Sequence, residues 1–157
     1  MMAVLTALHD SAVSTWIRES ESVWAFPTVL TVHTFGMMLL VGCAWVMDLR
    51  LLGVARSIPI GPLRPLFRVM WAAFWINLAS GVLLFIADPE RKATSLLFGV
   101  KMLLIIVNLP LLRCLERAVY GGAREPAAVG RGTRQLAAAS AALWAGTIFA
   151  GRLLGYM

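Results

Sequence analysis

Residues 26–50 read FPTVLTVHTFGMMLLVGCAWVMDLR. The stretch contains one ionisable side chain, His33, before it reaches the charged residues Asp48 and Arg50. An α-helix rises about 1.5 Å per residue, so the roughly 22 residues that precede Asp48 extend about 33 Å, enough to cross the hydrocarbon core of a bilayer. We therefore predict a membrane-spanning helix over 26–47.

The composition of the whole chain agrees with a membrane protein. Of its 157 residues, 60% are hydrophobic and 14% are charged, whereas about 25% of the residues in a soluble domain are charged. Further apolar stretches cover about 69–87, 96–115 and 136–156. We expect an all-α fold, an integral membrane four-helix bundle with up-down topology that forms a single transmembrane domain over 1–157.

The segments outside these spans also carry a pattern. In residues 2–25 apolar side chains recur at roughly helical spacing among charged ones, which is typical of an amphipathic interfacial helix at the membrane surface. The connection 48–68 contains Pro59, Pro62 and Pro65. Prolines at this spacing predict an extended, non-helical loop.

The distribution of Lys and Arg predicts how the spans are oriented. Short connections rich in these residues stay in the cytoplasm, so we expect 48–68 and 113–135 inside and both termini outside. The basic residues of the two connections are Arg50, Arg56, Arg64, Arg68, Arg113, Arg117, Arg124, Arg131 and Arg134. Their charge reports topology, so we expect no nucleic-acid partner. Cys43 and Cys114 fall toward the same side and are expected to be free thiols.

Each predicted span carries a polar residue at a similar depth. Counting from the expected outer ends of the spans places His33 about 10 Å deep, Ser80 about 12 Å, Lys101 about 8 Å and Arg152 about 6 Å, with Asn77 deeper. Ionisable side chains within a span are costly and mark functional sites. We therefore expect these side chains to line one pocket in the outer half of the membrane.

Helical spacing connects two further residues to this layer. Gly36 shares a face with His33, and Asn108 shares a face with Lys101. A glycine beside the imidazole is expected to leave room for the edge of a macrocycle, and a mid-span amide facing lipid is expensive. Structural explanations stay open as well, because cations near a membrane surface extend toward it and amides or imidazoles bond across helices.

The imidazole makes this layer a candidate haem site. A neutral imidazole in a helical bundle is a common axial ligand of b-type haem iron, so His33 is the predicted metal ligand. Lys101 and Arg152 could pair with the haem propionates. The second axial ligand would come from a second subunit or from one of the residues His9, Met37 and Met38.

A quinone would fit the same layer, with His33 as its hydrogen-bond partner and Lys101 and Arg152 binding its polar groups. Either cofactor would make the chain a redox subunit that passes electrons between the membrane and a periplasmic partner. We expect it to work in the lipid bilayer as a homo-oligomer or as a subunit of a membrane complex.

Two pairs of charged residues flank the first span. Arg18 and Glu19 lie just outside it and are expected to cover the site. Asp48 and Arg50 lie at its inner end and are expected to form an ion pair or a helix cap.

Two other functional classes remain open. His33, Lys101 and Arg152 at one depth could form an anion-binding or permeation site. The chain could also be a non-catalytic membrane anchor or assembly subunit whose polar groups only hold the helices together. Neither a catalytic Ser, His and acid nor a zinc-ligand spacing is present, so the sequence does not decide whether the chain is an enzyme.

Several short motifs are spread over most of the chain: Ile17-Arg18-Glu19-Ser20, Phe26-Pro27, His33, Gly36, Asp48-Leu49-Arg50-Leu51-Leu52-Gly53, Ser80-Gly81-Val82-Leu83-Leu84-Phe85, Ala87-Asp88-Pro89, Phe98, Lys101, Asn108, Trp144 and Gly151-Arg152. In these motifs the chain resembles an uncharacterised family of small four-span bacterial inner-membrane proteins. The resemblance implies a multi-pass protein of the bacterial inner (plasma) membrane and no particular activity. The chain is also loosely similar to b-type cytochrome membrane subunits and copper-resistance membrane domains, because all are helical bundles that contain histidine. The paired histidines of those proteins are missing from this sequence.

Overall fold

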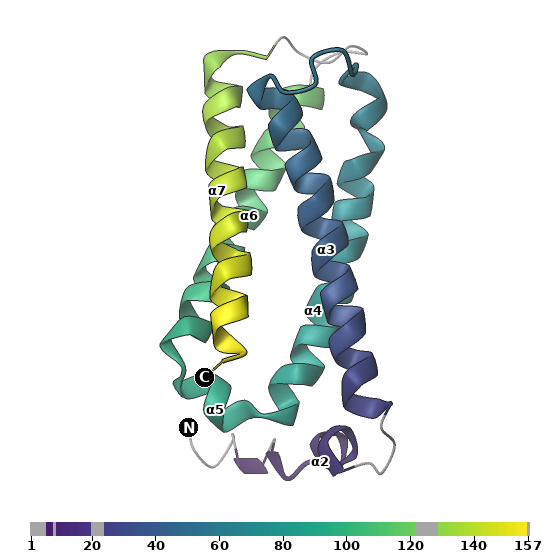
Figure 1. Cartoon of the computed structure of the whole chain (residues 1–157), viewed down its shortest axis with the longest axis vertical. Helices are drawn as coiled ribbons and strands as arrows, with labels where there is room; N and C mark the ends of the chain where they lie inside the picture. The colour runs from purple at the N-terminus through teal and green to yellow at the C-terminus, as the bar shows by residue number, and fades with distance from the viewer. Residues whose placement is uncertain (1–5, 8, 20–23, 122–128, 157) are drawn as a thin grey trace.

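The computed structural model describes residues 6–7, 9–19, 24–121 and 129–156, and at 13 and 17–19 it describes the backbone alone. All regular secondary structure in these ranges is helical. Four long helices dominate it, namely α3 (Ala25–Leu52), α4 (Pro65–Ala87), α6 (Leu96–Tyr120) and α7 (Arg131–Leu154). They run in up-down order along the long axis of the molecule (Figure 1). The predicted all-α four-helix bundle is confirmed, and all four helices are long and apolar enough to cross a membrane.

The remaining helices define the two ends of the bundle. The short helix α5 (Pro89–Thr94) joins α4 to α6 at one end, which we call the α5 end (Figure 1). The 3₁₀ helix η1 (Gly61–Leu63) precedes α4 at the other end, which we call the η1 end. Helix α2 (Ala12–Glu19) lies across the α5 end and contacts α3 and α4. It lies within the segment 2–25, which was predicted as one interfacial helix, and residues 10 and 11 before it form a turn and a bend.

At the η1 end all four long helices extend beyond the predicted spans. Helix α3 continues through Leu52, where Gly53 stops it with a positive φ of 102°. The Gly53 N–H donates to the Arg50 carbonyl and the Val54 N–H to the Leu49 carbonyl, which satisfies the last carbonyls of the helix. Hydropathy marks where the apolar residues end, but charged residues continue a helix readily, so these helices are longer than the predicted spans.

The expectation of an extended loop over 48–68 was wrong. Its first residues belong to α3, Pro62 lies within η1, and Pro65 is the first residue of α4. Proline is well accommodated at the start of a helix, because its missing N–H has no partner there in any case. The connection is therefore short and turned rather than extended.

The charged residues at the end of α3 do not pair with each other. Arg50 turns outward, and its guanidinium donates to the carbonyls of Ile58 and Arg56, so it closes the connection over the end of the helix. Asp48 faces the bundle interior beside Ser140 of α7 and is 1% exposed. The predicted ion pair is absent from the described salt bridges, and the helix end is capped by Gly53 and Val54 rather than by the side chain of Asp48 or Arg50. Both cysteines are free thiols, as expected.

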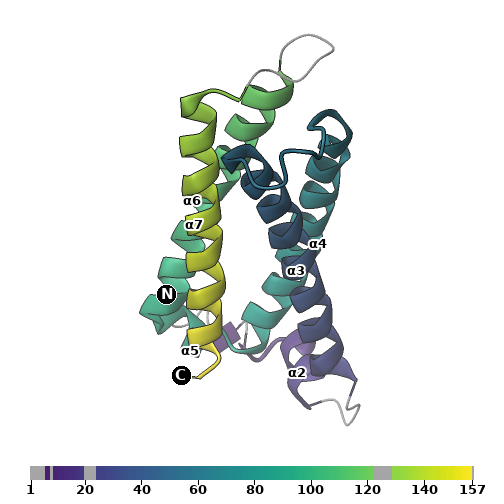
Figure 2. The ribbon, with the colours of Figure 1, turned by 45° about the horizontal axis from the view of Figure 1, so that its top comes forward.

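The helices pack as two pairs. Helix α3 packs along α4, and α6 along α7, while α7 also contacts α3. The fully buried apolar residues lie mainly toward the η1 end and include Met47, Leu51, Phe67, Met70, Leu112, Leu115 and Val119. Toward the α5 end the α3–α4 pair and the α6–α7 pair separate (Figures 1 and 2). This separation positions the candidate site.

Candidate functional site

A cavity of about 1500 Å³ lies at the α5 end, lined by residues of α3, α4, α5, α6 and α7. Most of its lining is apolar. Lining residues Leu78 and Val82 on α4 and Ile106 on α6 are 44%, 49% and 64% exposed, and the described contacts do not pack α4 against α6. The cavity therefore opens sideways between α4 and α6, toward the lipid that would surround the helices. A ligand that is dissolved in the membrane could reach it without crossing water.

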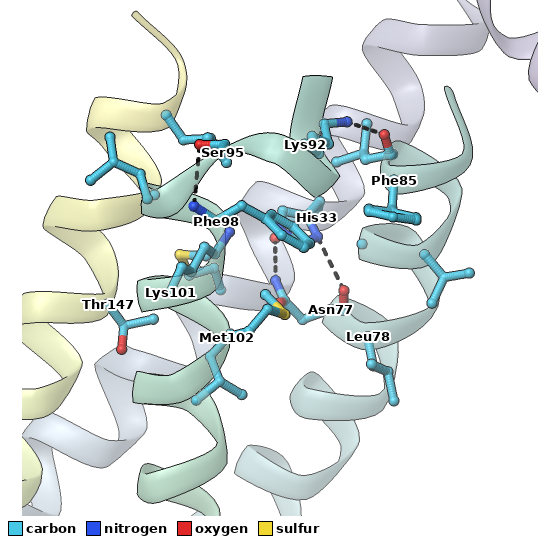
Figure 3. Close-up of a pocket in the computed structure, with 18 of the residues that line it drawn as sticks. His33, Asn77, Leu78, Phe85, Lys92, Ser95, Phe98, Lys101, Met102 and Thr147 are labelled. Atoms are coloured by element: carbon cyan, nitrogen blue, oxygen red, sulfur yellow. Dashed lines mark hydrogen bonds between the residues drawn. The ribbon is translucent and has the colours of Figure 1, made fainter. Parts of the chain in front are cut away.

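Aromatic side chains line the cavity at different depths. The rings of Phe85 on α4 and Phe98 on α6 stack with their centroids 5.5 Å apart, near the α5 end. Trp144 on α7 is 2% exposed and lines the cavity further toward the η1 end. His33, Asn77 and Lys101 come from three different helices, and Figure 3 shows them around the same pocket.

His33 on α3 is held by α4. Its Nδ1 lies 3.1 Å from the carbonyl oxygen of Asn77 (Figure 3). The Oγ of Ser80 also lies 3.1 Å from this nitrogen. Ser80 directs its own hydroxyl hydrogen at the Ile76 carbonyl, 2.8 Å away, so its oxygen accepts from the imidazole. Because both neighbours of Nδ1 are acceptors, Nδ1 carries the proton of the neutral ring and Nε2 keeps a lone pair. The imidazole thus has one nitrogen available for a ligand.

Asn77 strengthens this contact in the opposite direction. Its amide Nδ2 donates to the backbone carbonyl of His33 at 2.7 Å. The hydrogen bonding across helices that the sequence left open as a structural explanation for His33 is therefore present. Asn77 lines the cavity together with His33, whereas Ser80 is buried behind the imidazole.

The two glycines near His33 serve close packing. A Cβ on Gly36 would lie 3.3 Å from the backbone nitrogen of Asn77 and 3.4 Å from the carbonyl of Ala73. The expectation that Gly36 leaves room for a macrocycle is therefore wrong, because the backbone of α4 fills that space. A Cβ on Gly81 would lie 3.1 Å from Cε1 of His33, so this glycine lets the imidazole pack flat against α4.

Lys101 on α6 reaches the same cavity from the opposite side. Its side chain is half-buried and packs against Gly151 of α7, where a Cβ would meet Nζ at 3.5 Å. Its charge is close enough to act electrostatically on His33. Within the described residues Lys101 has neither a hydrogen bond nor an ion pair. An ammonium group in an apolar span without a counter-ion is unusual.

Two basic residues of α5 were not predicted as site residues. Arg91 and Lys92 both line the cavity beside Asp88. The ammonium of Lys92 donates to the Leu84 carbonyl, and its burial lowers its pKa below the ordinary value, against the opposing effect of Asp88. Arg91 lies 4.0 Å from the Asp88 carboxylate. Their position beside a polar turn gave no signal that they faced inward.

Two of the predicted site residues lie elsewhere. Arg152 is exposed on the outside of the bundle, with its guanidinium 5.7 Å from the ring centre of Tyr156. Asn108 is buried deeper, and its Nδ2 donates to the Leu104 carbonyl of its own helix at 3.1 Å. Neither lines the cavity. The predicted layer is thus assembled from His33, Asn77, Ser80 and Lys101, and it excludes the fourth span's cation.

Of the residues predicted as a second haem ligand, some line the cavity and one does not. His9 and Met37 line the cavity, whereas Met38 is 64% exposed on the outer surface. Met102 on α6 also lines it and was missed, because methionine in an apolar span carries no pattern of its own. Among the described residues no three His, Cys, Asp or Glu side chains come together as a metal site. Arg18 and Glu19, predicted to cover the site, lie outside the described side chains.

The described residues thus offer one imidazole nitrogen, one ammonium group without a hydrogen bond or ion pair among them, and a basic rim, all lining an apolar cavity that opens between α4 and α6. The chain matches no protein-family model, no curated protein and no solved structure. The family resemblance therefore stays a prediction.

Proposed function

We propose that the chain is a membrane redox subunit whose cavity binds a quinone. The observation that carries the proposal is the ammonium of Lys101, which has no hydrogen-bond or ion-pair partner among the described residues and lines the same apolar cavity as the imidazole of His33. A cation without a counter-ion favours a ligand that brings an oxygen acceptor. The surrounding apolar lining and the sideways opening favour a ligand with an apolar body.

A quinone meets both requirements. Its ring and tail are apolar, and its carbonyl oxygens accept hydrogen bonds. Lys101 would donate to one oxygen of the head group. The Nε2 lone pair of His33 would accept a hydrogen bond from a hydroxyl of the quinol, because Nδ1–H already donates to α4. The tail would leave between α4 and α6, where Leu78, Val82 and Ile106 meet the lipid.

The proposal includes an orientation. We place the α5 end and both termini on the periplasmic side of a bacterial inner membrane, because Lys and Arg concentrate at the η1 end. The cavity then lies in the outer half of the bilayer, where a periplasmic redox partner could exchange electrons with the quinone. The chain would act as a homo-oligomer or within a larger membrane complex.

A b-type haem is the second candidate, and the hydrogen bond of His33 favours it. Axial histidines commonly donate their second ring nitrogen to a backbone carbonyl, as Nδ1 of His33 does to Asn77. Lys92 and Lys101 could bind the propionates, and Met37, Met102 or His9 could approach the other face. A bound haem would supply one-electron transfer. The residues fit this group in charge, although none of the long helices brings a second histidine.

An anion site built from His33, Lys101 and Arg152 together is less favoured, because Arg152 lies outside the cavity. Lys92 would have to replace it. A simple anchor role is disfavoured by the cost of leaving Lys101 unpaired when a neutral residue would pack as well.

The test is ligand content and ligand binding of the detergent-purified chain. We expect extraction to release quinone, and a short-tailed quinone to quench tryptophan fluorescence through Trp144 at the end of the cavity. Lys101→Met should weaken this binding about tenfold or more. The matched control is Arg152→Gln, which removes a cation of the same predicted layer outside the cavity and should leave binding unchanged.

An absorption spectrum of the same preparation distinguishes the two cofactors. A Soret band that disappears in His33→Ala would show that the cavity binds haem rather than a quinone. A colourless protein that binds no quinone, or equal binding by wild type and Lys101→Met, would overturn the proposal and leave the anion-binding and anchor roles.

A further inference from the structure

Buried polar residues continue from the deep end of the cavity toward the η1 end. Trp144 lines the cavity, and Ser140 lies one helical turn further along the same face of α7. Ser140 is within hydrogen-bonding reach of Asp48 on α3. Asp48 and Ser140 are each 1% exposed. A carboxyl group and a hydroxyl thus lie directly beneath the cavity, in the interior of the bundle.

Asn108 on α6 belongs to the same set. Facing contacts fix the register of α6 and α7, because Gly146 packs on Leu104 and Gly151 packs on Lys101. One turn further along α6, Asn108 is therefore level with the turn of α7 that joins Ser140 to Trp144. Asn108 is 1% exposed, so it faces α7 and the core rather than lipid.

Three atoms of this set lack a hydrogen-bond partner within the described part of the chain. They are Oδ2 of Asp48, Oδ1 of Asn108 and Nε1 of Trp144. Buried polar atoms of native proteins are almost always satisfied, and ordered water commonly satisfies them. Two acceptors and a donor at neighbouring levels of one core are suited to hold a short file of water molecules.

Within the part of the chain that the structure describes, no cation pairs with Asp48. On its own helix Arg50 is engaged with the carbonyls of Arg56 and Ile58. On α6 Arg113 pairs with Glu116 at 3.4 Å and lies over the Trp71 ring of α4, while Arg117 is exposed. On α4 Arg68 is exposed, as are Arg64 before it and Arg131 and Arg134 on α7. A bare carboxylate in this core is expensive, so Asp48 would hold a proton.

We propose that Asp48 and Ser140 begin a proton path from the η1 end to the cavity, completed by water held at Asn108 and Trp144. The path rests on the proposed function, since a quinone takes up one proton for each electron it receives from a redox partner on its way to quinol. In each transfer the Asp48 carboxyl gives its proton to the water file and regains one from the η1 side. Ser140 relays by accepting a proton on its oxygen as it donates its own.

The first test does not need a quinone. Infrared spectra of the purified protein should contain the carbonyl stretch of one protonated carboxyl group at neutral pH, and this band should shift in D₂O. Asp48→Asn should remove it. Glu116→Gln, which alters a partly exposed carboxylate near the same end, should retain it. A wild-type spectrum without the band, or a band that persists in Asp48→Asn, would overturn the proposal.

The second test measures proton uptake when bound short-tailed quinone is reduced chemically in the presence of a pH-indicator dye. Asp48→Asn should bind quinone like the wild type but take up protons about a hundredfold more slowly. Ser140→Ala should keep the infrared band and still slow the uptake. Wild-type rates in Asp48→Asn would exclude the path, whereas absence of quinone binding in every variant would reject the proposed function and leave the infrared test of Asp48 standing.

Discussion

His33 and Asn77 hold α3 and α4 together through two hydrogen bonds of opposite direction. Nδ1 of His33 lies 3.1 Å from the Asn77 carbonyl oxygen, and the Asn77 amide donates to the His33 carbonyl oxygen at 2.7 Å. Each residue therefore offers the other both its side chain and its backbone. These bonds fix the orientation of the imidazole. The same contact that joins the two helices therefore also positions His33 for a ligand.

Asn77→Ala is expected to destabilise the protein. The substitution leaves the His33 carbonyl without its side-chain donor, and interhelical hydrogen bonds in membranes contribute about 0.6–2 kcal/mol. The midpoint of thermal unfolding in detergent should fall accordingly. Thr34→Ala provides the control, because Thr34 lies on the same helix but bonds only the Leu30 carbonyl of α3 itself. Equal midpoints for the two variants would contradict an interhelical role for Asn77.

Lys101→Met is expected to act in the opposite direction. Because the ammonium has no hydrogen bond or ion pair among the described residues, its removal loses none and relieves the cost of desolvating a charge, which we expect to stabilise the protein by about 1 kcal/mol. The unfolding midpoint should therefore rise while quinone binding falls. This combination separates a ligand-binding cation from a structural one. A lower midpoint in Lys101→Met would show that the ammonium has a structural partner instead.

The four-helix bundle could be predicted from the sequence because the apolar stretches that indicate it occur four times along the chain. Four apolar stretches of spanning length leave little choice of fold, and the up-down order follows from the short connections. The inward direction of His33, Asn77, Ser80 and Lys101 was also predictable, since a polar side chain inside a span avoids lipid.

The parts that failed depend on where helices approach one another. The sequence around Gly36 does not distinguish a glycine that faces a cofactor from one that faces a neighbouring backbone. Only the packing of α3 on α4 shows that Gly36 faces the backbone of α4. Arg152 lies close enough to the helix end to turn outward, and no pattern in α7 opposes this. Lys92 lines the cavity because the short helix α5 lies at the α5 end of the cavity, between α4 and α6. A short charged segment between two apolar stretches does not predict this position.

The orientation can be tested directly with a fused reporter. If the η1 end is cytoplasmic, a reporter that is active only in the periplasm should be active after Met157 and inactive within 122–128. A reporter that works only in the cytoplasm should give the reverse pattern. Cytoplasmic activity after Met157 would place the cavity in the inner half of the membrane and would contradict the role of a periplasmic partner.

Gly36→Leu is expected to separate α3 from α4 and to disturb the site without touching any of its polar atoms. A Cβ at this position would already lie 3.3–3.4 Å from the α4 backbone, which cannot retreat as a flexible side chain would. Forcing a larger residue into such a contact costs about 1–3 kcal/mol, and the shift should lengthen the contacts between His33 and α4.

Gly42→Leu is the matched control for this prediction. It introduces the same residue into the same helix, but a Cβ on Gly42 meets nothing within 4 Å. Removing a helix-interior glycine at an open position should even stabilise α3 slightly, by up to about 1 kcal/mol. We therefore expect a lower unfolding midpoint and weaker quinone binding for Gly36→Leu only. If both variants behave like the wild type, α3 and α4 are not packed as closely as the contacts of Gly36 require, and the imidazole is not held by α4.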